Sequence, residues 1–254
     1  MRLLPNLFLW FLLFGTLMFV GCTSVEPTKD ASQDATYHKL MGASALNENN
    51  PADALREYLQ AEQFDDRDPE IQAGLAEAYM RKKAFVEAER HYQRALDLSN
   101  YEPKYFNNLG ALYLTMERYD DAIAAFRSAA ENLLFDRPEV SWTGVGVANY
   151  QKGDYPAAER AYQKAKEINP LYFQVPYRLG ELYFAQGRPV EAAENFNKAV
   201  ELFPNFAEGY YWLGLTYMKI EETGKARSAF QDVVRLDPRS EEARLAKKYL
   251  DILD

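Results

Sequence analysis

Apolar side chains recur at spacings of three and four positions from about residue 35 to residue 238, which is the spacing of one helix face. The segment 139–170 contains two such helices, separated by a Lys-Gly-Asp break. Trp142 and Val145 share a face of the first helix, and Tyr162 lies on the apolar face of the second. Because neither helix can bury its apolar stripe alone, the segment predicts a unit that stacks on copies of itself.

The same pattern occurs six times with a period of 34 residues, which lengthens to 36 between the third and fourth copies. Each copy has a small residue in its first helix and an alanine twelve positions later in its second helix, followed after four positions by an aromatic residue. Small residues at these positions allow the two helices to approach closely. The small residues are Gly42, Ala76, Gly110, Gly146, Gly180 and Gly214, and the alanines are Ala54, Ala88, Ala122, Ala158, Ala192 and Ala226.

These columns resemble the tetratricopeptide repeat. The resemblance implies an all-α fold, a right-handed superhelical solenoid of six helix-turn-helix repeats with a C-terminal capping helix. Ser240 is placed to cap that last helix, because serine accepts hydrogen bonds from the first free N–H groups of a helix. The predicted repeats are 35–68, 69–102, 103–138, 139–172, 173–206 and 207–238, and the capping helix is 239–254.

The longer spacing between repeats 3 and 4 falls around Asn132–Pro138. Two interpretations are open. The extra residues lengthen the connecting loop, or they lengthen the second helix of repeat 3 and change the curvature of the solenoid there.

Residues 1–21 predict a lipoprotein signal peptide, with Arg2 followed by an uncharged apolar run. The sequence Phe19-Val20-Gly21-Cys22 resembles a bacterial lipobox. That resemblance implies that Cys22 becomes the N-terminal residue and carries fatty acyl chains such as palmitate. Since Thr23 follows, it also implies the outer membrane. The alternative is an uncleaved membrane anchor in which Cys22 has no special role, because the run is long enough to span a bilayer.

Residues 22–34 comprise the lipidated cysteine and a polar segment with Pro27, which predicts a flexible tether. The formal net charge of the chain is −9, which argues against a nucleic-acid partner. The single cysteine excludes an intrachain disulfide, and the two histidines lie in different repeats. Because no phosphate-binding loop and no nucleophile with a base is present, we expect no enzyme activity, no metal, no cofactor and no small-molecule substrate.

The fifth, ninth and twelfth positions of each repeat unit are among those expected to line the concave side of the solenoid, where such arrays hold a peptide or a partner's helix. These positions are richest in apolar and aromatic residues in repeats 4–6. The alternative is that the aromatic residues pack against neighbouring helices as core. The predicted partner-binding residues are Val147, Tyr150, Tyr177, Glu181, Phe184, Tyr211, Leu215 and Met218.

A lipid-anchored chain with six such repeats and little else resembles the pilotin lipoproteins of type IV pilus biogenesis, of the PilF/PilW type. The resemblance implies a protein on the periplasmic face of the outer membrane that binds a secretin subunit and assists secretin localisation and multimerisation. Two alternatives remain. One is a general periplasmic adaptor for outer-membrane protein assembly or for cell-wall enzymes. The other is an enzyme with a site on the solenoid, for which the sequence nominates no residue.

Overall fold

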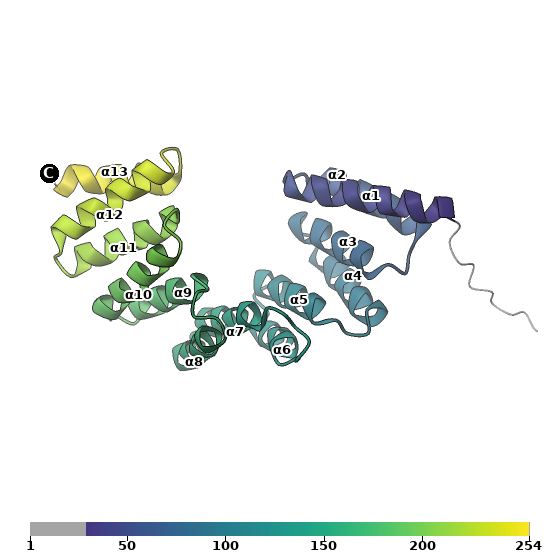
Figure 1. The fold of residues 1–254 in the computed structure, drawn as a ribbon, viewed down its shortest axis with the longest axis horizontal. Coiled ribbons are helices and arrows are strands. Elements are labelled where there is room, and N and C mark those ends of the chain that lie inside the picture. The colour runs from purple at the N-terminus through teal and green to yellow at the C-terminus, as the bar shows by residue number, and fades with distance from the viewer. Residues whose placement is uncertain (1–28, 254) are drawn as a thin grey trace, which may run out of the picture.

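The computed structural model describes residues 29–253, which form thirteen α-helices and no strand (Figure 1). The prediction of an all-α solenoid is therefore confirmed. Within the described residues, no helix combines the length and the apolar character needed to cross a membrane. The helices are α1 (Lys29–Asn47), α2 (Pro51–Phe64), α3 (Pro69–Arg81), α4 (Phe85–Leu98), α5 (Pro103–Thr115), α6 (Tyr119–Ala130), α7 (Pro138–Lys152), α8 (Tyr155–Ile168), α9 (Gln174–Ala185), α10 (Pro189–Leu202), α11 (Ala207–Lys219), α12 (Thr223–Leu236) and α13 (Glu241–Leu253).

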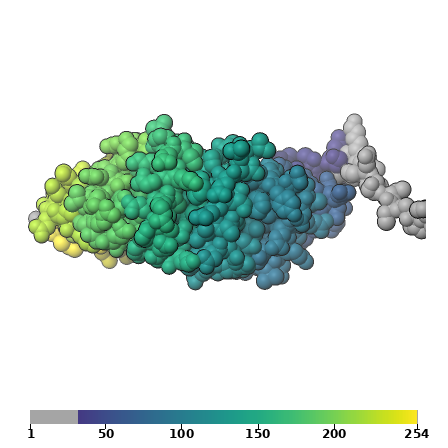
Figure 2. All heavy atoms as spheres, turned by 90° about the horizontal axis from the view of Figure 1, so that it is seen from below, coloured from purple at the N-terminus to yellow at the C-terminus, as the bar shows by residue number. Residues whose placement is uncertain are grey.

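Each helix packs on the one before it and the one after it, so the chain builds an open arc from α1 to α13 (Figure 1). In the middle of the arc, α5, α7 and α9 lie on the inner side, while α6, α8 and α10 lie outside them. The surface is one continuous elongated body with the two ends of the array far apart (Figure 2). In this part of the array, the odd-numbered helices therefore supply the concave surface.

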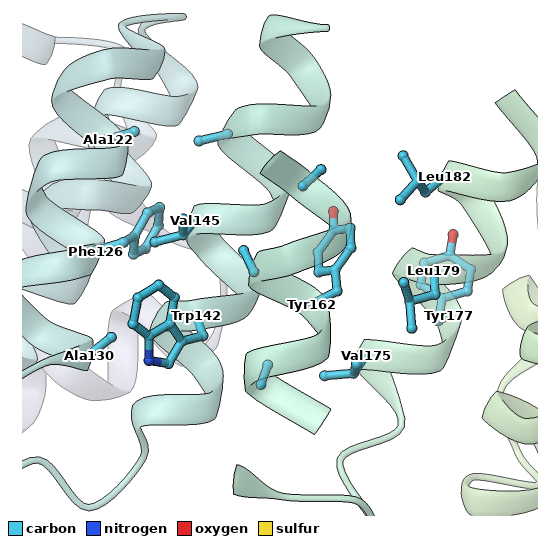
Figure 3. Close-up of a cluster of buried hydrophobic side chains, with 14 of the residues drawn as sticks. Ala122, Phe126, Ala130, Trp142, Val145, Tyr162, Val175, Tyr177, Leu179 and Leu182 are labelled. Atoms are coloured by element: carbon cyan, nitrogen blue, oxygen red, sulfur yellow. The ribbon is translucent and has the colours of Figure 1, made fainter. Parts of the chain in front are cut away.

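The small residues in the first helices lie against the aromatic side chains that follow the recurrent alanines of the second helices. A Cβ added at Gly146 would come within 2.2 Å of Cε1 of the Tyr162 ring. A Cβ added at Gly110 would lie 2.8 Å from the Phe126 ring, and one added at Gly180 would lie 2.6 Å from the Phe196 ring. Figure 3 shows Tyr162 and Phe126 among the buried side chains between successive helices. Gly214 contacts Phe230 in the same way, and Ala122, Ala158, Ala192 and Ala226 are fully buried.

The helix boundaries follow from local chemistry. Gly153 ends α7 with a φ of 85°, a left-handed conformation that suits glycine. Asp154 then caps α8, since its Oδ1 accepts a hydrogen bond of 3.0 Å from the backbone N–H of Ala157. At the end of the array, the Oγ of Ser240 accepts one of 3.1 Å from the N–H of Ala243, as predicted.

The tether is shorter than the sequence predicts, because α1 begins at Lys29 and residues 29–34 are helical. This stretch contains neither glycine nor proline, so nothing in it interrupts a helix. Its first turns also gain a side-chain hydrogen bond, in which the Oγ1 of Thr36 donates to the carbonyl oxygen of Ser32 at 2.9 Å. Pro27 and Cys22 lie outside the described residues.

The longer spacing between repeats 3 and 4 is a longer loop. The second helix of repeat 3, α6, has 12 residues, whereas the other even-numbered helices have 14. The interpretation of a lengthened helix is therefore wrong. The physical reason lies in Asn132, whose side-chain Oδ1 accepts a hydrogen bond of 2.9 Å from the N–H of Leu134 and so closes a turn that ends the helix.

The stability of the array should fall in mild acid because of His91. This ring is buried, with its Nδ1 at 2.7 Å from Oε1 of Gln72, and burial lowers its pKa below the ordinary value of 6.5. The unfolded chain therefore binds the proton more readily, so this histidine's contribution to stability is complete above pH 6.5 and is lost as the pH falls below it. Urea unfolding at several pH values should show a shallower loss in His91→Gln than in the parent.

The matched control for this titration is His38→Gln, which removes the other histidine and keeps His91. It leaves the His91–Gln72 contact in place, so the loss of stability attributed to His91 should remain. Equal slopes for His91→Gln and the parent between pH 7 and pH 5 would contradict the assignment.

Candidate protein-binding surface

The inner side of α7, α9 and α11 carries seven of the eight predicted partner-binding residues as half-buried side chains. We call this set the C-terminal inner surface. Each apolar member packs partly against the core and leaves part of its area open to solvent. The set comprises Val147, Tyr150, Glu181, Phe184, Tyr211, Leu215 and Met218.

Tyr177, the eighth predicted residue, belongs to the core. Its side chain is 1% exposed, and its ring centroid lies 4.9 Å from that of Phe206 and 5.9 Å from that of Phe196. Its hydroxyl donates a hydrogen bond of 2.8 Å to Oε1 of Glu208. The prediction that Tyr177 faces a partner is wrong, because Phe206, in the connection to α11, covers the ring. Figure 3 shows Tyr177 among the buried side chains.

The inward aromatic residues are expected either to contact a partner or to pack as core. Each aromatic side chain of the C-terminal inner surface packs on the core with one part of its ring and leaves another part open. The Tyr150 ring lies 5.6 Å from the Tyr155 ring, and the Phe184 ring meets Trp212 edge to face at 5.5 Å. These contacts hold the rings in place on the core. Their remaining area is open, so the surface presents rigid aromatic groups that need little ordering when a partner binds.

One charged pair lies within this apolar surface. Nη1 of Arg178 is 2.7 Å from Oε2 of Glu181, and both side chains are partly buried. Burial raises the pKa of the Glu181 carboxyl, and the adjacent guanidinium opposes only part of that rise. Burial acts to lower the pKa of Arg178, but the attraction of Glu181 outweighs it and the pKa is raised. The pair therefore offers a partner a fixed, directional polar contact.

Sequence reasoning missed three residues that border this surface. Trp212 supports Phe184 from the next repeat, and Nζ of Lys219 lies 4.6 Å from the centroid of the Phe184 ring. Tyr249 in α13 extends the surface past the last repeat and stacks on Phe230 at 5.0 Å. Tyr249 could not be identified from its position in the repeat, because α13 is not a copy of the repeat. The sequence feature that could have indicated it is a tyrosine beside the apolar face of this last helix.

Repeats 1 and 2 carry ion pairs on their first helices. Nζ of Lys39 lies 2.7 Å from Asp68 and 2.9 Å from Glu70, which links α1 to α3. Arg81 pairs with Glu77 at 2.7 Å. Repeats 1 and 2 thus combine ion pairs with half-buried apolar residues such as Leu46 and Met80, whereas the inner positions of repeats 4–6 are mostly apolar and aromatic.

Comparison with known families identifies the repeat. Family models described as tetratricopeptide repeat match residues 69–134, 107–172 and 207–240, and one described as TPR repeat matches residues 180–220. Among curated proteins, the BBSome complex member BBS4 of Bos taurus is 23% identical over 207 residues, which is 80% of this chain and 39% of BBS4. The chain thus spans about two fifths of this relative. Stress-induced-phosphoprotein 1 of Caenorhabditis elegans is 24% identical over 245 residues, or 83% of this chain and 75% of that protein.

Two solved structures share the arrangement of the helices. PilW, described as a widely conserved type IV pilus biogenesis factor, superposes with a TM-score of 0.72 at 16% identity, covering 85% of this chain and 99% of PilW. PilF of Pseudomonas aeruginosa superposes with a TM-score of 0.68 at 18% identity, covering 87% of this chain and 99% of PilF. At these identities the likeness concerns the fold.

Proposed function

We propose that this chain, which belongs to the tetratricopeptide-repeat proteins, binds a subunit of the type IV pilus secretin on its C-terminal inner surface. In this proposal, the protein is anchored to the periplasmic face of the outer membrane by acyl chains on Cys22. It helps the secretin to reach that membrane and to multimerise. Repeat proteins of this class bind other proteins, and the secretin is the specific partner proposed.

The observation that carries the proposal is the half-open aromatic surface of repeats 4–6. A contiguous apolar patch left exposed on a folded protein marks a site of interaction. Phe184 and Tyr211 offer aromatic contacts, and the Arg178–Glu181 pair offers a polar one, a combination that suits the apolar face of a partner segment. The choice of partner is supported by the shape shared with PilW and PilF along nearly their whole length.

The anchor is supported by the sequence Gly21-Cys22 at the end of the apolar run. Acyl chains contribute about 0.8 kcal/mol per buried methylene, so several chains on one residue hold a protein firmly on a membrane.

A second candidate is a general periplasmic adaptor for outer-membrane protein assembly or for cell-wall enzymes. It is favoured by the curated relatives, which include a BBSome complex member and a stress-induced phosphoprotein. One of these relatives is named as a member of a different protein complex.

Deletion of the gene should remove secretin multimers from the outer membrane, as seen on gels of unboiled membranes. The wild-type gene should restore them, and Cys22→Ser should fail to restore them although its array is unchanged. Normal multimers in the deleted strain would contradict the proposal. Co-purification of a cell-wall hydrolase or an assembly factor, without secretin, would establish the second candidate instead.

A further inference from the structure

The loop between α6 and α7 leaves two leucines almost entirely exposed to solvent. Leu133 is 100% exposed and Leu134 is 89% exposed. The neighbouring connection between α4 and α5 exposes Tyr101, which is 56% accessible. Tyr101, Leu134 and Phe135 line one open cavity of about 650 Å³ between the two connections. Two adjacent connections therefore project apolar groups outward together.

The fold does not require these leucines. The loop 131–137 has seven residues, whereas the other connections from an even-numbered helix to the next odd-numbered helix have four or five. Its turn is closed by Asn132, through the side-chain bond to the N–H of Leu134 and a backbone bond of 3.1 Å to the N–H of Phe135. Neither bond uses a leucine side chain. The leucines thus occupy the longest of these connections in the described part of the chain.

These connections lie on the same edge of the array as the start of α1. We call the connections 65–68, 99–102 and 131–137, together with the start of α1, the connection edge. Side-chain contacts connect the neighbouring parts of this edge, from α1 to the loop 131–137. Lys39 of α1 binds Asp68, Glu70 lies 3.8 Å from Lys104, and Lys104 lines the same cavity as Leu134. Figure 1 shows the start of α1 and the α2–α3 and α4–α5 connections on one side of the ribbon.

We propose that the connection edge rests on a lipid bilayer, with Leu133 and Leu134 inserted among the lipids. The inference depends on the anchor at Cys22 in the proposed function. Six residues separate Cys22 from Lys29. An extended chain of this length keeps the start of α1 within about 25 Å of an anchored Cys22. Burying each leucine in the apolar region favours the contact about tenfold.

The charge of the edge determines which lipid suits it. Acidic residues outnumber basic ones on it, with Asp65, Asp66 and Asp68 in one connection and Asp136 in another. A surface of this sign is repelled by anionic lipids and not by zwitterionic ones. The bilayer that fits the edge is therefore zwitterionic, and phosphatidylcholine vesicles are a suitable probe.

The test uses the full chain, extracted from membranes and reconstituted into phosphatidylcholine vesicles with and without brominated acyl chains, which quench tryptophan on contact. In Leu134→Trp, about half of the added emission should be lost with brominated lipid. Val86→Trp is the matched control, because Val86 is an exposed apolar residue at the start of α4, on the opposite edge. Its added emission should be unchanged.

Flotation of the vesicles shows separately whether the protein is attached to the membrane through its anchor. Leu134→Trp that floats with the vesicles and is quenched no more than Val86→Trp would overturn this inference and leave the anchor intact. A chain that does not float would overturn both. Neither result depends on whether a secretin binds the inner surface.

Discussion

Replacing Gly146 with valine should destabilise the chain by about 3 kcal/mol, the upper range for overpacking a well-filled core. A Cβ at this position would lie within 2.2 Å of the Tyr162 ring, which is closer than two non-bonded carbon atoms can approach. The ring cannot move aside, because it is 1% exposed and held between α7 and its neighbours. Loss of helical circular dichroism on heating or in urea should therefore occur well below the parent's midpoint.

Gly224→Ala is the matched control, also a replacement of a glycine within a helix. Nothing lies within 4 Å of a Cβ at Gly224, which sits in the first turn of α12. Alanine there should stabilise the chain by about 0.5–1 kcal/mol, because it restricts the unfolded chain without a clash. If Gly146→Val unfolds at the same urea concentration as the parent, the close approach of helix and ring is not part of the folded protein.

The helix pairs could be predicted from sequence because their determinants are local and repeated. A glycine such as Gly146 and an aromatic residue such as Tyr162 recur at fixed spacing, and each copy supports the interpretation of the others. The loop 131–137 and the early start of α1 occur once each, so no second copy indicated them. There the outcome depends on single groups, such as the side chain of Asn132.

The exposure of individual site residues could not be predicted from their position in the repeat. Tyr177 and Tyr211 hold the same position in successive units, yet Tyr177 is buried and Tyr211 is partly open. The difference comes from Phe206, in the connection after repeat 5, which packs on Tyr177. The connection after repeat 6 has no aromatic residue. A contact of this kind joins residues far apart in the sequence and belongs to no column of the repeat.

The combined change Leu215→Gln and Met218→Gln should weaken binding of the partner by about thirtyfold, or about 2 kcal/mol. Both side chains lie on α11 and are packed on one side only, so a partner would cover their open area. Glutamine keeps the helix and most of the volume while placing an amide where an apolar contact is needed. The measurement is the affinity of the purified protein for the secretin subunit.

Leu114→Gln is the matched control for this change. Leu114 has the same position in repeat 3 as Met218 has in repeat 6, and it is also half-buried. It lies outside the C-terminal inner surface, so it should leave the affinity within about threefold of the parent. Equal losses in the two variants would indicate a general effect on the array rather than a binding site.

Photo-crosslinking in living cells, from single positions of the full-length protein, shows directly whether a secretin binds the C-terminal inner surface. A photoreactive amino acid at Met218 probes the C-terminal inner surface, and one at Val190, exposed at the start of α10, probes the edge away from it. We expect a secretin adduct from position 218 and none from position 190. Equal adducts from both positions, or an adduct from position 218 to a protein other than a secretin, would rule out the proposed binding of a secretin to the C-terminal inner surface.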